Sequence, residues 1–183
     1  MFLTQASIFL RPYVRDVLKS LSQEFEIIIF TASHRGYADK VIDILDPDKQ
    51  WVSHRLFREH CFQSKQGVYV KDLRVINRKL KDMIIVDNAL YSYGLQIDNG
   101  VPIIPYYNCK EDAELLMLQE YLLSLREEDD IREINRSVFK YDCYREAENL
   151  SACFLQLFSN QKQKRGTSAN KRPPSVGPEG LKN

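Results

Sequence analysis

The stretch Ile27-Ile28-Ile29-Phe30-Thr31-Ala32-Ser33 carries most of the information about the fold. Its run of consecutive apolar residues, mostly β-branched, predicts a strand buried on both faces, as in a parallel sheet with helices above and below. The run stops at Thr31 and Ser33. Ligands of open α/β sheets lie outside the carboxyl ends of the strands, so both hydroxyls are placed where a phosphate would be hydrogen-bonded. The alternative is that they only cap the next helix.

Helices are predicted on both sides of this strand. Apolar residues recur at helical spacing over residues 12–22, which begin with Pro12, and again over residues 35–46, which end before Pro47. A short apolar run at residues 7–10 predicts an additional strand. The alternation of strands and helices is typical of a doubly wound parallel sheet.

The middle of the chain continues this pattern after an interruption. Residues 51–70 contain short strand-like pieces joined by polar turns, which predict a small β-rich insertion or flap. A short helix is expected at residues 72–79. A second buried strand is expected at residues 83–86, followed by Asp87 and Asn88. A third strand, at residues 101–104, is assigned to a sheet edge because Pro102 lacks an N–H group.

Beyond residue 110 the sequence changes character. Residues 111–125 predict an amphipathic helix, and the charged residues 126–130 a solvated segment. Residues 131–158 are expected to form one further helix, anchored by Phe139, Tyr141, Phe154 and Phe158. We therefore divide the chain into a partial α/β domain at 1–126, a helical extension at 127–158 and a disordered basic tail at 159–183.

Bulk composition excludes several classes of protein. The formal net charge is +1, which predicts neither nucleic-acid nor membrane binding. The four cysteines form no C-x-x-C pair, so we expect free thiols in a reducing compartment and no zinc site. No apolar run approaches the roughly 20 residues of a membrane span, and the first residues lack the features of a signal peptide. We therefore expect an intracellular protein, in the nucleus or the cytoplasm.

Candidate chemistry lies at or just after the predicted strands. Thr31, Lys71, Asp87 and Asn88 provide a hydroxyl donor, a cation, a carboxylate and a neutral oxygen ligand. Each is weak evidence alone, since a hydroxyl often caps a helix and an Asp-Asn pair often makes a turn. Together they suit phosphoryl transfer, in which Mg²⁺ takes oxygen ligands and a lysine neutralises phosphate charge.

Several strings carry a resemblance to a known family. Arg11-Pro12, FEIIIFTAS, YAD, RLFRE-x-C, YVKDL and MIIVDN occur in this order and at characteristic spacings over about residues 8–125. They resemble the small phosphatases of the RNA polymerase II C-terminal domain, in the NLI-interacting-factor-like branch of the haloacid dehalogenase superfamily. The resemblance implies a haloacid-dehalogenase-like (Rossmannoid) parallel sheet with helices on both faces, and a Mg²⁺-dependent phosphoserine or phosphothreonine phosphatase acting on phosphoproteins.

The same resemblance implies roles for particular residues. Thr31 matches the phosphate-binding hydroxyl and Lys71 the phosphate-neutralising lysine. Asp87 and Asn88 match the acid and amide of the metal site, with Asn88 on Mg²⁺. A tyrosine of the helix after the threonine and the last arginine of R-L-F-R lie by the peptide substrate in this family. These two positions match Tyr37 and Arg58.

One departure from the family is important. The family begins with D-L-D-E-T at the end of its central strand, whose first aspartate is the nucleophile and whose second is the general acid. No D-x-D-x-[TV] occurs in this sequence. The strand that carries it would lie between the strands predicted at residues 25–30 and 83–86, and its absence leaves backbone groups on both sides without a neighbour. We expect a truncated reading frame, an incomplete gene model or a degenerate paralogue.

Two hypotheses for function remain. The first is a Mg²⁺-dependent protein serine/threonine phosphatase whose site needs residues that this chain lacks, so that the chain as written is inactive. The second is a non-catalytic phosphopeptide- or protein-binding module that uses Tyr37 and Arg58. Retention of Thr31, Lys71 and the Asp87-Asn88 pair favours the first.

Overall fold

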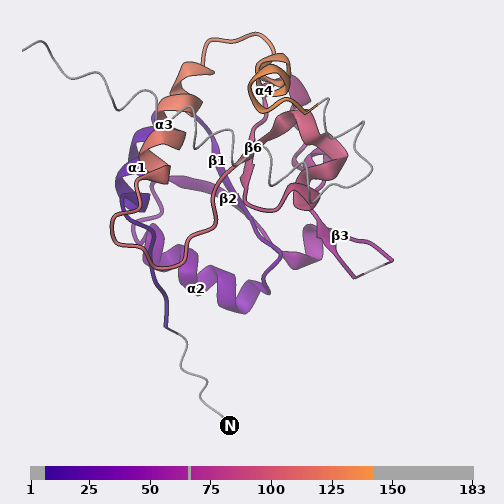
Figure 1. The fold of residues 1–183 in the computed structure, drawn as a ribbon. Helices are drawn as coiled ribbons and strands as arrows, with labels where there is room; N and C mark the ends of the chain where they lie inside the picture. The colour runs from indigo at the N-terminus through magenta and orange to yellow at the C-terminus, as the bar shows by residue number, and fades with distance from the viewer. Residues whose placement is uncertain (1–6, 66, 142–183) are drawn as a thin grey trace, which may run out of the picture. The chain divides into compact units, whose positions relative to one another are not determined.

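The computed structural model describes residues 7–65 and 67–141, all of which belong to the first of two units, residues 1–141. This part is a mixed α/β structure with parallel strand pairs and helices around them (Figure 1). Its α-helices and strands are α1 (Val14–Leu21), β1 (Ile27–Phe30), α2 (Arg35–Leu45), β2 (Val52–Leu56), β3 (Phe62–Gln63), β4 (Tyr69–Val70), β5 (Ile85–Asp87), β6 (Gly100–Pro102), α3 (Glu114–Ser124) and α4 (Ile131–Phe139). The 3₁₀ segments are η1 (Arg58–His60), η2 (Leu73–Ile76), η3 (Leu80–Asp82) and η4 (Leu90–Asn99), the last with non-helical backbone at Tyr93 and Gln96.

The strands form three separate pairs. β1 pairs in parallel with β2, β5 pairs in parallel with β6, and β3 forms a short antiparallel hairpin with β4. The prediction that all of residues 51–70 belong to an insertion is therefore wrong, because β2 is a parallel neighbour of β1. Only the β3–β4 hairpin has the character of an insertion. β2 was missed because Ser53 and His54 are polar and exposed, so the strand has no apolar run.

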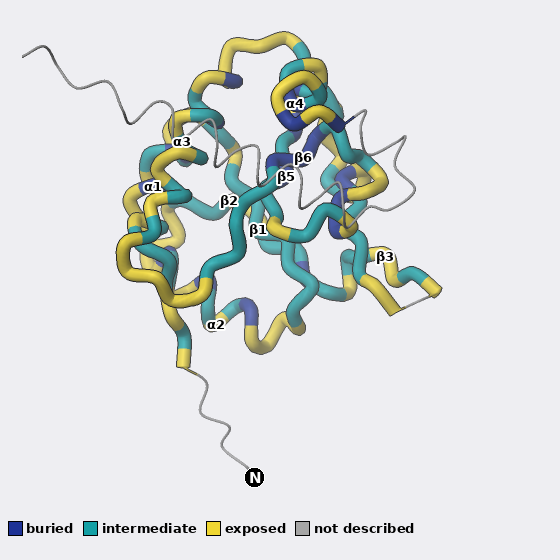
Figure 2. The backbone as a smooth tube through the Cα atoms, viewed as in Figure 1, coloured by how far each residue is buried: buried dark blue, intermediate teal, exposed yellow. Residues whose placement is uncertain are grey.

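β1 is less buried than its sequence predicts. All four of its residues are only partly buried, and β1 is drawn in the intermediate colour along its length in Figure 2. The prediction of burial on both faces is thus wrong for the described chain. The reason is that, among the described residues, β1 has one hydrogen-bonded neighbour, β2, and does not pair with β5.

Each parallel pair has its own apolar core. Ala38 and Ile42 of α2 pack with Phe57, and Ile29 and Val52 of the β1–β2 pair lie against this cluster. A second cluster surrounds β5 and consists of Leu73, Met83, Ile85 and Tyr93. Helix periodicity places the apolar face of α2 inward, as the sequence predicts. The two clusters thus pack against different strand pairs.

The N-terminal described residues differ from the prediction. Residues 7–10 have no strand assignment, because the chain there is held by the side chain of Arg11 and not by a ladder. The guanidinium of Arg11 donates to both carboxylate oxygens of Asp112 at 2.8 Å and to the carbonyl oxygen of Ile104 at 2.8 Å. This contact joins the start of the chain to the segment before α3. Figure 1 shows α1 and α3 next to each other.

The predicted helix at residues 131–158 is also too long. α4 ends at Phe139, because Lys140 adopts a left-handed backbone with φ 53°. Phe139 and Tyr141 are buried as expected, and the Tyr141 hydroxyl donates to the carbonyl oxygen of Gly100 at 2.8 Å. Phe154, Phe158 and the predicted tail lie outside the described residues.

Asp46 fixes the connection between α2 and β2. Its side chain is almost fully buried, and its carboxylate accepts the backbone N–H groups of Gln50, Trp51 and Val52, each at 2.9 Å. Burial alone would raise the pKa of Asp46, but the three backbone donors outweigh burial and lower this pKa below its ordinary value. Asp46 thereby sets where β2 starts beside β1.

Replacing Asp46 is expected to destabilise the fold in a graded way. Asp46→Asn keeps one acceptor oxygen and should cost about 1–2 kcal/mol of unfolding free energy, and Asp46→Ala about 3 kcal/mol, because buried donors lose their acceptor. Since the folded-state pKa is lowered, the wild-type contribution is complete above the unfolded value of about 3.9 and is lost as pH falls through the folded value. The Asp46→Asn variant should not show this decrease in unfolding free energy at acidic pH. Urea unfolding over the acid range measures both effects.

The matched control is Asp48→Asn, since Asp48 is exposed in the same turn. It should change the unfolding free energy by less than about 0.5 kcal/mol. Equal effects at positions 46 and 48 would contradict the assigned role.

Candidate functional site

Thr31 follows the last residue of β1 directly. Its N–H donates to the carbonyl oxygen of Leu56 at 2.9 Å, which continues the β1–β2 ladder by one residue. Its hydroxyl oxygen accepts the N–H of Ser33 at 3.1 Å. α2 begins with His34 as the N-cap and has no side-chain cap, so Thr31 does not cap this helix. The hydroxyl hydrogen keeps its capacity to donate to an anion.

Arg58 holds the loop that follows Thr31. Its Nε donates to the carbonyl oxygen of Ala32 at 2.6 Å, and its Nη1 lies 2.7 Å from Nε2 of His34. Its guanidinium also lies over the ring of Tyr69, 4.9 Å from the centroid. Arg58 therefore supports the Thr31 loop in addition to any contact with a substrate. The resemblance implied only the latter.

Lys71 and Asp87 form a largely buried ion pair. The Lys71 ammonium contacts Oδ2 of Asp87, and the two side chains are only 13% and 10% exposed. Oδ1 of Asp87 accepts the N–H of Ala89 at 2.7 Å, and the N–H of Lys71 donates to the carbonyl oxygen of Ser92 at 2.6 Å. Both backbones are thus fixed around the pair. Asp87 is the last residue of β5, so the pair lies at the carboxyl end of that strand.

Cys61 contacts the Thr31 end of the site. Its Sγ is 3.9 Å from the carbonyl oxygen of Thr31. Burial raises the pKa of the Cys61 thiol, while the charges of Lys71 and Arg58 act in the opposite direction. Cys61 thus contacts the Thr31 backbone, and its thiol is influenced by the charges of Arg58 and of Lys71, the partner of Asp87.

The remaining two sequence candidates are exposed. Tyr37 lies in the first turn of α2 and is 51% exposed. Asn88 follows β5 and is exposed beside Asp87. Both side chains are therefore accessible. Their roles stay predictions.

The described residues do not make a complete Mg²⁺ site. They contain no group of three or more His, Cys, Asp or Glu side chains arranged to hold a metal ion. Asp87 and Asn88 provide one carboxylate and one amide, and the lysine already neutralises that carboxylate. Mg²⁺ usually needs one or two carboxylates together with phosphate and water. The donors present are therefore only part of a magnesium site.

Comparison with known proteins gives the family. A family model described as "NLI interacting factor-like phosphatase" matches residues 2–132. The chain belongs to this family. The resemblance carried by the strings around Thr31, Lys71 and Asp87 is thereby confirmed, and with it the haloacid-dehalogenase-like α/β class.

The relatives agree with this assignment. CTD small phosphatase-like protein 3 of Caenorhabditis elegans is 44% identical over 137 residues, covering 74% of this chain and 47% of its own length. The human CTD small phosphatase-like protein is 41% identical over 129 residues, covering 69% of this chain and 45% of its own. A mitochondrial import inner membrane translocase subunit of Candida glabrata is 36% identical, covering 84% of this chain and 30% of its own. The chain thus spans less than half the length of each of these relatives.

Two solved structures of the RNA polymerase II CTD phosphatase Fcp1 are also similar. One has a TM-score of 0.47 at 16% identity, covering 90% of this chain and 51% of the other. The other, from fission yeast and bound to beryllium fluoride, has a TM-score of 0.45 at 14% identity. In the described part of this chain, no helix has the length and apolar character needed to cross a membrane.

Sequence reasoning missed three residues of this site. Cys61 was noted only as a free thiol and as part of a family string, with no role in the site, and His34 was not considered, because a single cysteine or histidine has no diagnostic spacing. Ser92 was not considered either, yet it is buried and its carbonyl oxygen fixes the Lys71 backbone. No local pattern identifies such a contact, since Ser92 is brought to Lys71 only by the fold.

Mutations of the two residues of this ion pair are expected to have non-additive effects on the free energy of unfolding. Lys71→Met or Asp87→Leu alone should cost about 2–4 kcal/mol of unfolding free energy, because each leaves a largely buried charge without its partner. The double variant should cost clearly less than the sum, by about 2 kcal/mol. Denaturant unfolding of the four proteins measures this coupling.

The control is the exposed pair Arg35–Glu59, whose side chains are 58% and 49% exposed. The same cycle there should give a much smaller coupling, because solvent screens an exposed pair. A coupling for Lys71 and Asp87 as small as that for the control would show that the pair does not fix the site.

Proposed function

We propose that this chain carries the phosphate-binding part of a phosphoprotein phosphatase site of the NLI interacting factor-like family. Its substrates are phosphoserine or phosphothreonine peptides. The supporting observation is the arrangement of Thr31 and Lys71 near the carboxyl ends of β1 and β5, with Lys71 held by Asp87. Phosphate groups are recognised by this combination of a neutral donor and a cation.

Each residue has a defined task in this proposal. The Thr31 hydroxyl, already oriented by the Ser33 N–H, donates to a non-bridging phosphate oxygen. An ammonium group has three N–H donors, so Lys71 can keep Asp87 and also donate to phosphate. Arg58 stabilises the loop that presents Thr31, and its guanidinium, together with the exposed Tyr37, contacts the peptide around the phosphorylated residue.

In this proposal, the chain by itself does not hydrolyse phosphate esters. Hydrolysis through a covalent intermediate requires an activated nucleophile. The D-x-D-x-T pair is absent from the sequence, and Asp87 is occupied by Lys71 and the Ala89 N–H. We therefore infer that the chain on its own binds phosphate but does not hydrolyse its esters.

Magnesium belongs to the complete site. When bound, the ion would neutralise charge on the transferring phosphoryl group. Asp87 and Asn88 are the residues of this chain that would contribute oxygen ligands, and they need further carboxylates. We accordingly propose that the isolated chain has no tight Mg²⁺ site.

A second candidate is a phosphopeptide- or protein-binding module without catalytic activity. The observation that favours it is the absence of the aspartate pair in a chain that otherwise retains Thr31, Lys71 and Arg58. Both candidates predict phosphopeptide binding. We also propose a location inside the cell, in the nucleus or the cytoplasm, and phosphoproteins rather than membranes or nucleic acids as partners.

Binding measurements test this proposal. Phosphoserine peptide is expected to bind, whereas the serine peptide should bind at least about tenfold more weakly because it lacks the charge that Lys71 neutralises. Lys71→Ala should weaken the binding of both the phosphopeptide and inorganic phosphate. Calorimetry measures these affinities, and release of phosphate from the peptide should stay at background in the presence of Mg²⁺.

Tyr37→Ala and Arg58→Ala provide matched comparisons. Tyr37→Ala should weaken binding of the phosphopeptide but not of inorganic phosphate, because the Tyr37 side chain is exposed and is proposed to contact only the peptide. Arg58→Ala should weaken both, because Arg58 also holds the Ala32 carbonyl oxygen. Equal binding of phosphorylated and unphosphorylated peptide would overturn the proposal. Turnover that disappears in Lys71→Ala would overturn the inferred inactivity.

A further inference from the structure

Arg58 holds the loop after Thr31 through three contacts, and one of them is made to a histidine. The backbone N–H of Arg58 donates to the carbonyl oxygen of Ser33 at 3.1 Å, and its Nε donates to the carbonyl oxygen of Ala32 at 2.6 Å. Its Nη1 lies 2.7 Å from Nε2 of His34. A guanidinium can only donate, so Nε2 of His34 is the acceptor. His34 makes this contact as a neutral imidazole that carries its proton on Nδ1.

A second histidine accepts a hydrogen bond beside Arg58. Nδ1 of His60, in η1, accepts the backbone N–H of Phe57 at 2.9 Å. Phe57 is almost fully buried, and Arg58 follows it directly. Because Nδ1 accepts, His60 is also neutral here and carries its proton on Nε2. The two imidazoles are thus opposite tautomers, and both fix the segment from which Arg58 reaches the Thr31 loop.

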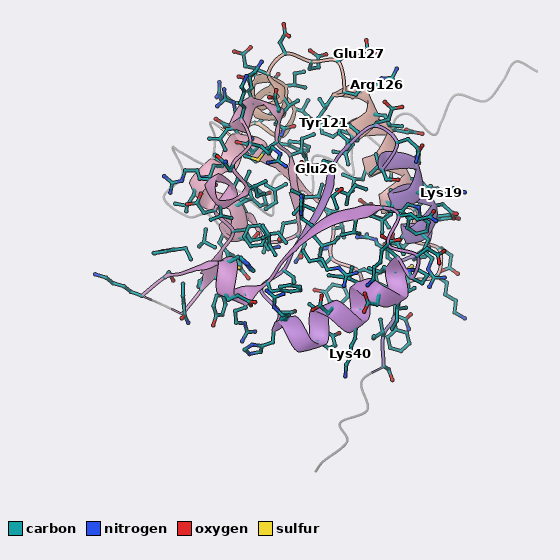
Figure 3. The ribbon with its side chains drawn as sticks, turned by 180° about the vertical axis from the view of Figure 1, so that it is seen from behind. Lys19, Glu26, Lys40, Tyr121, Arg126 and Glu127 are labelled. Carbon is teal, nitrogen blue, oxygen red and sulfur yellow. The ribbon has the colours of Figure 1, made fainter. Side chains whose placement is uncertain are left out.

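The third histidine of the sequence has a different kind of partner. Nε2 of His54 lies 3.3 Å from Oε1 of Glu26, so protonation of His54 strengthens its contact. Glu26 precedes β1, whereas Thr31 follows that strand, and Figure 3 shows Glu26 well apart from Lys40 of α2. His54 therefore provides an internal comparison for the two histidines that act as acceptors.

We propose that His34 and His60 are positioning residues for the phosphate site and make it sensitive to acid, because they hold Arg58 and the Thr31 loop only while both imidazoles are neutral. Histidine is the side chain that changes charge between about pH 5 and 8. Protonation removes the acceptor lone pair of each ring, and at His34 it sets a second cation against the Arg58 guanidinium. The inference rests on the proposed phosphate binding and adds its regulation by pH.

The groups that surround the two imidazoles do not compensate an added positive charge. Glu59 lies within the electrostatic influence of His60, but Arg35 of α2 already pairs with Glu59 at 3.0 Å. On the side of β4, the Arg58 guanidinium lies over the neutral ring of Tyr69, 4.9 Å from its centroid. Protonation therefore adds positive charge beside an arginine, next to a carboxylate that already has a cationic partner.

An added positive charge also attracts phosphate, so the two effects need to be compared. His34 contacts Arg58 directly, at 2.7 Å, whereas the proposed phosphate is held by Thr31 and Lys71. The His34 side chain is exposed, so solvent screens its action over a longer distance. Cys61, beside Thr31, adds no charge, because burial raises the pKa of its thiol. The lost contact therefore outweighs the attraction, and the affinity for phosphate falls as the pH decreases.

Two amide substitutions test the acceptor role. His34→Gln puts an amide oxygen in the place of Nε2, His60→Asn puts one in the place of Nδ1, and neither amide gains a proton on acidification. At about pH 7.5 the double variant should bind a phosphoserine peptide within about twofold of the wild-type chain. At about pH 5.5 the wild-type chain should bind this peptide about five- to tenfold more weakly than the double variant, which corresponds to the loss of about one hydrogen bond. Calorimetry on the full chain measures these affinities.

Two further variants are the controls. Protonation of the phosphate itself weakens binding in all variants alike, so the difference between variants is the relevant quantity. His54→Gln should keep the full pH dependence of the wild-type chain, whereas His34→Leu, which offers no acceptor, should bind weakly at both pH values. Equal pH dependence in the wild-type chain and the double amide variant, or weak binding by that variant at both pH values, would overturn this inference alone. A phosphopeptide that binds at no pH would overturn the proposed function as well.

The imidazole nitrogens provide a test that needs no ligand. Nitrogen nuclear magnetic resonance on the ligand-free chain near neutral pH distinguishes the two tautomers of each ring. His34 should be protonated at Nδ1 and His60 at Nε2, because the other nitrogen of each ring accepts a hydrogen bond. The reverse tautomer at either residue would show that this ring is not the acceptor. That result would overturn the inference and leave phosphate binding at Thr31 and Lys71 untouched.

Discussion

Lys71 and Asp87 are 16 residues apart in sequence and meet in a largely buried ion pair at the end of β5. A charge in such a place is tolerated only with a partner, so each residue constrains where the other can lie. Lys71 is held by the carbonyl oxygen of Ser92, and Asp87 by the N–H of Ala89. The pair therefore connects the hairpin, the end of β5 and the start of η4. The proposed phosphate site depends on this connection.

The rest of the described fold is organised in two halves. α2 and Phe57 support β1 and β2, while Leu73, Met83 and Tyr93 support β5. Side-chain contacts join the halves at both ends, through Glu26–Arg78 and through the Cys61–Lys71 neighbourhood, but no β-ladder does so. Such a structure depends more on its polar contacts than a continuous sheet would. It also explains why an apolar strand such as Ile27–Phe30 remains only partly buried.

Much of the fold and of the candidate site was predictable from local sequence patterns. The strands at Ile27–Phe30 and Ile85–Asp87 have apolar runs, and the polar residues after them could be placed at one end of a parallel arrangement. The family resemblance of the surrounding strings was confirmed. Other features depend on neighbours that a single sequence does not reveal. The half-burial of β1 reflects its pairing on one side, and Val52–Leu56 is a strand because Asp46 starts it beside β1, although its residues alternate poorly.

The end of α4 and the role of Arg58 show the same limit. Lys140 takes the left-handed conformation without being the usual glycine or asparagine, so no composition signal marks the end of the helix. Arg58 was predicted only to lie beside a peptide substrate. Its hydrogen bond to the carbonyl oxygen of Ala32 shows that it also supports the Thr31 loop. Whether it also contacts a peptide is a prediction that binding measurements decide.

The central claim is that the ends of β1 and β5 form one phosphate-binding site. The most direct measurement is a crystal structure of the chain grown with inorganic phosphate. The account predicts a phosphate within hydrogen-bonding distance of both the Thr31 hydroxyl and the Lys71 ammonium, with Lys71 still in contact with Asp87. A phosphate bound elsewhere, with Thr31 and Lys71 contacting only protein, would contradict it.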